Sequence, residues 1–166
     1  ACDEFGSVRV GVLCDGMGGG RGGELASEIA ARVFITGVRR IVGELGNSWS
    51  DDEARHEAYS EVIDHCHDSV GGISEAGGSG TTLTAVVATF DEGGSPSIDL
   101  IHIGDSRCYR VLDSRADLLT NDHSVTGDMV RAGYIQMHEI EETSGKNTLT
   151  KNIGDENSSK ADVSTI

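Results

Sequence analysis

Apolar residues in the first half of the chain fall into two kinds of periodic block. Residues 8–14 read as a β-strand that leads into a glycine-rich turn over 15–23. Over 25–45, apolar residues recur at steps of three to four, which predicts a long amphipathic helix. A second helix is expected over 50–71, with Ser50 as its N-cap and acidic residues in its first turn. The residues of the first helix expected on its apolar face are Leu25, Ile29, Val33, Val38, Ile41, Val42 and Leu45.

The second half of the chain changes to strand-like segments. The Thr- and Val-rich residues 81–90, followed by the apolar segments 98–103 and 107–112, predict a three-stranded antiparallel meander. A short helix is expected over 124–133 and a further strand over 162–166. Because helices bracket consecutive strands and do not alternate with them, we expect an α+β fold with helices packed on an antiparallel sheet.

The bulk composition is that of one domain covering residues 1–166. The chain is 37% hydrophobic and contains no internal repeat or linker. Its formal net charge of −15 argues against nucleic acid and anionic membrane surfaces as partners, because both require a basic face. No apolar run is long enough to cross a membrane, and no secretion signal precedes Val8. The composition does not indicate an oligomeric state.

The cysteines point to a reducing compartment. Cys2, Cys14, Cys66 and Cys108 form no C-x-x-C pair, so we expect reduced, structural thiols and a cytoplasmic location. The sequence His-Cys-His over 65–67 is not a convincing zinc site. Consecutive helical residues diverge by about 100° each and do not converge on one ion.

Two acids at the ends of predicted strands are the candidate metal ligands. Asp15 ends the first apolar strand beside a glycine-rich backbone, where its carboxylate and the Gly16 carbonyl suit a hard cation. The alternative is that Asp15 only caps the following helix. Asp105 ends another apolar strand, in a Gly-Asp-Ser turn that is also ordinary hairpin chemistry. The glycine-rich segments 15–23 and 77–82 lack the lysine of a nucleotide-binding loop.

Six short motifs follow one another along the chain. They are Asp15-Gly16-Met17-Gly18-Gly19, Ser79-Gly80-Thr81-Thr82-Leu83, Gly104-Asp105-Ser106-Arg107-Cys108-Tyr109, Leu119-Thr120-Asn121-Asp122-His123-Ser124, Met129-Val130-Arg131-Ala132-Gly133-Tyr134-Ile135 and Asn147-Thr148-Leu149-Thr150-Lys151-Asn152-Ile153-Gly154. In this order and at this spacing, they resemble the PP2C (PPM) family of metal-dependent serine/threonine protein phosphatases. The resemblance covers essentially the whole chain.

The resemblance implies a fold and a set of ligands. The fold would be a four-layer α-β-β-α sandwich of two antiparallel sheets flanked by helices. Asp15 would be the catalytic residue that bridges two Mg²⁺ or Mn²⁺ ions, and the Gly16 carbonyl would ligate one of them. Asp105 would belong to a further, more weakly held ion, and Asp3 matches the final acid of the family's opening motif. Segment 136–146 falls where bacterial-type members carry a mobile flap.

The resemblance also implies a reaction. It would be the hydrolysis of phosphoserine or phosphothreonine in a phosphoprotein, without a covalent intermediate. Two cations about 3.5–4 Å apart would hold a bridging water that attacks phosphorus in line. Met17 stands where many eukaryotic members place a histidine proposed as general acid, so metal-bound water would protonate the leaving group. Asp122 and His123 are expected to have structural roles.

The sequence departs from the family pattern at both ends. Cys2 replaces the Glu of the opening motif, and the family's phosphate-binding arginine would fall before residue 1. Two further metal-binding aspartates would follow Ile166. We therefore expect a domain truncated at both ends that binds metal poorly and turns over slowly or not at all by itself. The alternatives are a non-catalytic pseudophosphatase or regulatory module of the same fold, and an unrelated acidic binding domain.

Overall fold

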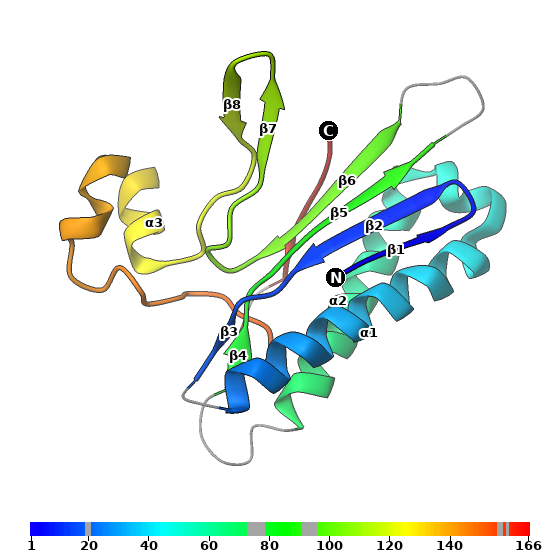
Figure 1. The fold of residues 1–166 in the computed structure, drawn as a ribbon, viewed down its shortest axis with the longest axis horizontal. Coiled ribbons are helices and arrows are strands. Elements are labelled where there is room, and N and C mark those ends of the chain that lie inside the picture. Colours follow the sequence, from blue (N-terminus) through cyan, green and yellow to red (C-terminus); the bar gives the residue numbers. More distant parts are fainter. Residues whose placement is uncertain (19–20, 73–78, 91–95, 156–157, 159) are drawn as a thin grey trace.

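A five-stranded antiparallel sheet forms the centre of the computed structural model (Figure 1). The structure describes residues 1–18, 21–72, 79–90, 96–155, 158 and 160–166. The sheet has the strand order β1-β2-β5-β6-β9, and β3–β4 and β7–β8 form two separate two-stranded ladders. The strands are β1 (Cys2–Phe5), β2 (Val8–Leu13), β3 (Gly16–Met17), β4 (Gly80–Thr81), β5 (Leu83–Thr89), β6 (Ser97–Ile103), β7 (Tyr109–Leu112), β8 (Arg115–Leu118) and β9 (Asp162–Thr165).

Two long helices cover one face of this sheet. They are α1 (Arg21–Leu45) and α2 (Asp52–Gly71), joined by the 3₁₀ helix Gly46–Ser50. The β7–β8 hairpin and α3 (Val125–Arg131) lie on the other side of the sheet (Figure 1). The expected α+β class is confirmed. No helix among the described residues is long and apolar enough to span a membrane.

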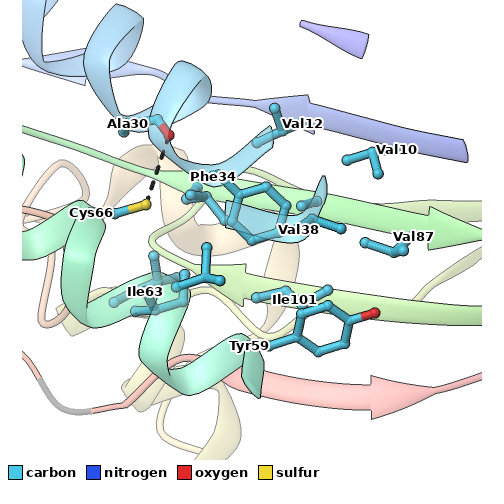
Figure 2. Close-up of a cluster of buried hydrophobic side chains, with 14 of the residues drawn as sticks. Val10, Val12, Ala30, Phe34, Val38, Tyr59, Ile63, Cys66, Val87 and Ile101 are labelled. Carbon is cyan, nitrogen blue, oxygen red and sulfur yellow. Dashed lines mark hydrogen bonds between the residues drawn. The ribbon is translucent and has the colours of Figure 1, made fainter. Parts of the chain in front are cut away.

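The main core lies between the helix pair and the sheet (Figure 2). Alternate residues of β2 point into it, because successive side chains of a strand lie on opposite faces. Four-residue steps place the buried side chains of α1 on one stripe. Buried residues that make up this core include Val8, Val10, Val12, Ala26, Ala30, Phe34, Val38, Tyr59, Val62, Ile63, Cys66, Val87 and Ile101.

The two long helices occur where the sequence predicts them, with two differences in detail. The buried stripe of α1 is formed by Ala26, Ala30 and Phe34, while Leu25 is 40% exposed. Val38 and Ile41 continue this stripe, as expected. The predicted residues Ile29, Val33, Val42 and Leu45 are partly buried against the core, so the face differs mainly in its first turns, where small alanines lie closest to the sheet. Asp51, and not Ser50, caps α2, and its carboxylate accepts the first free backbone N–H groups of that helix.

The predicted three-stranded meander is wrong in its third strand. β5 and β6 pair as expected, but the other edge of β6 pairs with β9. The segment after Ile103 turns away from the sheet, and β7 pairs only with β8. The expected strand over 162–166 is confirmed as β9. The glycines 19 and 20 and residues 77–78, which belong to the two glycine-rich segments, lie outside the described residues.

A buried ionic network joins α2 to the middle of β6. Asp99 is 1% exposed and accepts hydrogen bonds from Arg55 Nε at 2.8 Å, Tyr59 Oη at 2.9 Å and Thr165 Oγ1 at 2.6 Å. Burial opposes ionisation of Asp99, but the hydrogen bonds from Arg55, Thr165 and Tyr59 outweigh it, so the pKa of this carboxyl lies below its ordinary value. The network fixes the register of α2 and β9 on the sheet.

Replacing Asp99 with Asn is expected to lower the free energy of unfolding by about 3–5 kcal/mol, because the buried Arg55 guanidinium loses its counter-charge. Urea denaturation followed by circular dichroism measures this loss. The matched control is Glu44→Gln, which removes the exposed ion pair with Arg40 and is expected to cost about 0.3–0.5 kcal/mol. Equal losses in the two variants would contradict a structural role for the Asp99 network.

The same network predicts a dependence of stability on acid. The folded pKa of Asp99 is lowered, so its stabilising contribution is complete above the unfolded value of about 3.9 and disappears as pH falls through the folded pKa. The difference in unfolding free energy between the wild type and Asp99→Asn should therefore shrink below about pH 4. Urea unfolding at a series of pH values from 7 to below the folded pKa tests this, and a constant difference would refute it.

Candidate metal centre

The ends of two strands bring Asp15 and Asp105 to the same edge of the sheet. β2 and β6 each pair antiparallel with β5, so they run parallel to one another and end on the same side. The register aligns Leu13 with Thr84 and Thr84 with His102. Asp15 is the second residue after β2, and Asp105 is the second residue after β6. Neighbouring strands are about 4.8 Å apart, so β2 and β6, with β5 between them, lie roughly 10 Å apart. The edge of the sheet at which β2 and β6 end is called the rim below.

Thr82, just before β5, connects the two turns that carry these acids. Its hydroxyl Oγ1 accepts the Asp15 backbone N–H at 3.0 Å and lies 2.7 Å from the Ser106 hydroxyl. Its own N–H donates to the Asp15 carbonyl at 3.0 Å. The Thr84 hydroxyl lies 3.1 Å from the Ser106 carbonyl oxygen. The two turns are thus held on either side of the first residues of β5.

Gly104 allows the second turn to approach this closely. Its φ is +112°, a conformation that side chains rarely adopt, and a Cβ there would lie 2.6 Å from the Cβ and Cγ2 atoms of Thr82. Gly16 is similarly restricted, since a Cβ on it would lie 1.9 Å from the carbonyl oxygen of Gly23 at the start of α1. Both turns therefore require a glycine, because the backbone at Gly104 and Gly16 lies too close to its neighbours to leave room for a side chain.

His123 holds the Gly104 turn from the other side. Its backbone N–H donates to the Gly104 carbonyl at 2.7 Å, and its ring Nδ1 lies 3.1 Å from the Gly104 nitrogen and accepts that N–H. The proton therefore sits on Nε2, which lies 3.1 Å from Asp162 Oδ2 on β9. Burial is the main cause that lowers the pKa of His123 and favours the neutral ring. Arg107 forms a two-pronged ion pair with Asp122 beside this turn.

The two rim acids have no ion-pair partner within the described part of the chain. The acids Asp99 and Asp122, in contrast, are each paired with an arginine. Burial, followed by the negative charges of Asp122 and Asp15, raises the pKa of Asp105 above its ordinary value. Two carboxylates without an ion-pair partner are hard oxygen donors, which suits a divalent cation such as Mg²⁺ or Mn²⁺.

Asp3 does not join this set. It lies opposite Val10 in the β1–β2 ladder, several residues from the rim, and forms an ion pair with Arg39 on α1. Among the described residues, no group of three or more His, Cys, Asp and Glu side chains is placed to hold a metal ion, and this includes segment 65–67. The donors present therefore fit a weakly held cation better than a two-ion centre.

Segment 136–146, predicted as a flap, lies near the second turn. It contains the 3₁₀ helix Met137–Glu142, which begins with a capping box between Gln136 and Glu139. The Met137 sulfur lies 3.5 Å from Arg107 Nη2. The segment therefore contacts the arginine that follows Asp105 by two residues. Whether it moves stays a prediction.

Sequence reasoning missed Thr82 and Ser106 as structural parts of the rim. Both residues belong to motifs of the family resemblance, but the sequence pattern indicates no role at the site for either of them. The sequence offered one signal. Thr82 lies at the start of the predicted strand that falls between the strands leading to Asp15 and Asp105, and its hydroxyl can both donate and accept a hydrogen bond. The expected structural role of His123 agrees with its contacts to Gly104.

Known proteins are similar to this chain in sequence. No family model matches the chain. Protein phosphatase PhpP of Streptococcus pneumoniae is 32% identical over 163 residues, which cover 93% of this chain and 60% of the relative. The serine/threonine phosphatase stp of Listeria welshimeri is 26% identical over 156 residues, which cover 92% of this chain and 58% of the relative. By sequence, the chain resembles the PP2C-type phosphatases.

Solved structures extend the likeness to the fold. The S. agalactiae serine/threonine phosphatase superposes with a TM-score of 0.78 at 28% identity and covers 100% of this chain and 66% of that chain. The PPM phosphatase MsPP from Mycobacterium smegmatis, in complex with cacodylate, gives 0.70 at 32% identity, with 100% and 65% covered. The PP2C-like fold is confirmed. The chain spans about 60% of the length of the curated relatives it matches.

Replacing Gly104 with Ala is expected to destabilise the protein more than the same change at Gly133. Both glycines have positive φ, +112° and +76°, but a Cβ at Gly133 meets nothing within 4 Å. Backbone strain costs about 1–3 kcal/mol in each, and only Gly104→Ala adds the clash with Thr82. Urea unfolding measures both variants. Equal losses would mean that the Thr82 contact yields without cost and does not fix the turn.

Proposed function

We propose that this chain is part of a metal-dependent phosphoprotein phosphatase that hydrolyses phosphoserine and phosphothreonine. The observation that carries the proposal is the meeting of Asp15 and Asp105 at one rim, within a chain that resembles PP2C-type phosphatases over 93% of its length. Mg²⁺ or Mn²⁺ is the proposed cofactor. In support, the catalytic domain of the phosphatase PstP, which has the same fold at 22% identity and a TM-score of 0.64, was solved in complex with 2 manganese ions.

Asp15, the Gly16 carbonyl and Asp105 are the proposed ligands. Asp15 is the proposed catalytic residue, since it lies two residues after β2 and is exposed at the rim. When bound, divalent cations lower the pKa of water and neutralise charge on a phosphoryl group. Asp3 is not included, because its carboxylate is paired with Arg39.

Two other residues near the rim, Arg107 and Met17, limit the chemistry that the chain itself can contribute. Arg107 is held by Asp122 at 2.6 Å and is not free to bind a phosphoryl group without breaking that pair. Met17, which pairs with Gly80 in the β3–β4 ladder, has a thioether that carries no proton to donate. Protonation of the leaving group must therefore come from water. Because the described residues place two carboxylates at the rim, we expect weak metal binding and slow turnover by the 166-residue chain.

A non-catalytic module of the same fold is the second candidate. Cys2, which stands where the family has a Glu, is exposed and pairs with Gly11 in the β1–β2 ladder. Such a module would bind a phosphoprotein without hydrolysing it. Binding of a phosphopeptide in the presence of Mn²⁺, with no phosphate release even on long incubation, would favour this second function over the first.

Asp15→Asn is expected to weaken Mn²⁺ binding by at least about tenfold, and Asp105→Asn by a comparable or smaller factor, because each removes a charged oxygen donor from the rim. Titration of free Mn²⁺ by electron paramagnetic resonance measures the affinity. Mn²⁺-dependent hydrolysis of p-nitrophenyl phosphate measures activity in parallel.

The matched control is Asp117→Asn. This acid pairs with Arg110 and Arg115 on the β7–β8 hairpin, away from the rim, so its loss should leave Mn²⁺ binding unchanged. The same affinity in wild type, Asp15→Asn and Asp117→Asn would show that the rim is not the metal site and would overturn the proposed function.

A further inference from the structure

One hydroxyl oxygen lies between the two turns that carry the proposed metal ligands. Thr82 Oγ1 accepts the Asp15 N–H at 3.0 Å on one side and lies 2.7 Å from the Ser106 hydroxyl on the other. A hydroxyl can accept and donate at once, so this geometry satisfies both contacts. Ser106 directly follows Asp105. A single atom is therefore hydrogen-bonded to Asp15 itself and to the residue next to Asp105.

The surroundings leave Thr82 little freedom to move. The residue is 2% exposed, and its backbone N–H is bonded to the Asp15 carbonyl at 3.0 Å. The Gly104 backbone packs against the Thr82 methyl group so closely that a Cβ on residue 104 would overlap the Thr82 side chain. Leu83, the next residue, is fully buried at the start of β5. Movement of either turn would break a hydrogen bond to a side chain that cannot follow.

We propose that Thr82 is a positioning residue that sets the separation of the Asp15 and Asp105 turns, and through it the spacing of the two carboxylates. Its importance for a cation rests on the proposed function. Both carboxylates lack an ion-pair partner in the described part of the chain, so no salt bridge there maintains their spacing. Neutral hydrogen bonds through Thr82 hold the turns without neutralising the acids.

The neighbouring threonine provides a matched control. Thr81 is also fully buried, but its hydroxyl donates to the Thr82 carbonyl at 3.0 Å and contacts neither turn. Thr82→Val and Thr81→Val therefore make the same chemical change one residue apart. Thr82→Ser keeps the hydroxyl and removes only the methyl group, so it should restore whatever Thr82→Val loses.

The first measurement needs no metal. Amide hydrogen exchange, followed residue by residue by NMR on the 166-residue chain, reports the Asp15 and Gly104 N–H groups. In Thr82→Val the Asp15 N–H loses its acceptor and is expected to exchange about tenfold faster. The Gly104 N–H is bonded to His123 Nδ1, so it reports the second turn indirectly, and it should also exchange faster if that turn is no longer held through Ser106. Thr82→Ser and Thr81→Val should stay within about threefold of wild type at both positions. Faster exchange at Asp15 alone, or the same change in Thr81→Val, would overturn the proposal, because the two turns would then not be linked through Thr82.

The second measurement is Mn²⁺ affinity by electron paramagnetic resonance on the same four proteins. Thr82→Val should bind about tenfold more weakly, as is usual when a residue that orients a ligand is lost, and Thr82→Ser should bind like wild type. Unchanged affinity in Thr82→Val, despite loosened turns, would overturn the positioning role. If the wild type itself shows no Mn²⁺ binding at the rim, the proposed function fails, and the exchange data alone decide whether Thr82 links the turns.

Discussion

The antiparallel pairing of β5 with both β2 and β6 is the constraint on which the candidate site depends. Because β5 lies between them, β2 and β6 run in the same direction and end at one edge, so residues far apart in sequence become neighbours. The first residues of β5 then lie between the two exits, and Thr82 is the only position from which one side chain reaches both turns among those described. A shift of β5 by one residue would move Leu83 out of the main core and point the Thr82 side chain to the other face.

The interior of the sheet and its rim are stabilised by different chemistry. Toward its middle, Asp99 is buried and fully compensated by Arg55, Tyr59 and Thr165, which anchors α2 and β9. At the rim, by contrast, backbone amides, hydroxyls and the neutral ring of His123 hold the turns. Ionic compensation thus stabilises the scaffold, and neutral hydrogen bonds shape the site. Because the buried ion pair that stabilises the fold lies away from the rim, Asp15 and Asp105 can stay unpaired there without a loss of folded structure.

Local patterns predicted the elements well and their partners less well. The alternation over 8–14 and the helical periodicity over 25–45 specified β2 and α1, because each depends on near neighbours in sequence. The third strand of the meander failed, since the pairing of β6 with β9 involves residues about sixty positions away. Asp3 was placed by motif position alone. Its actual neighbour, Arg39, lies on a helix surface that no strand pattern reveals.

The site residues show where sequence reasoning reaches its limit. Asp15 and Asp105 could be named because acids directly after apolar strands are conspicuous, and the family resemblance put them in order. Thr82 could not be named, because its role arises only when two turns meet around it. A cationic side chain could not replace it, because a guanidinium or ammonium group only donates hydrogen bonds and cannot accept the Asp15 N–H. A neutral hydroxyl fixes the same separation and leaves the negative charge intact, which is what binding of a hard cation requires.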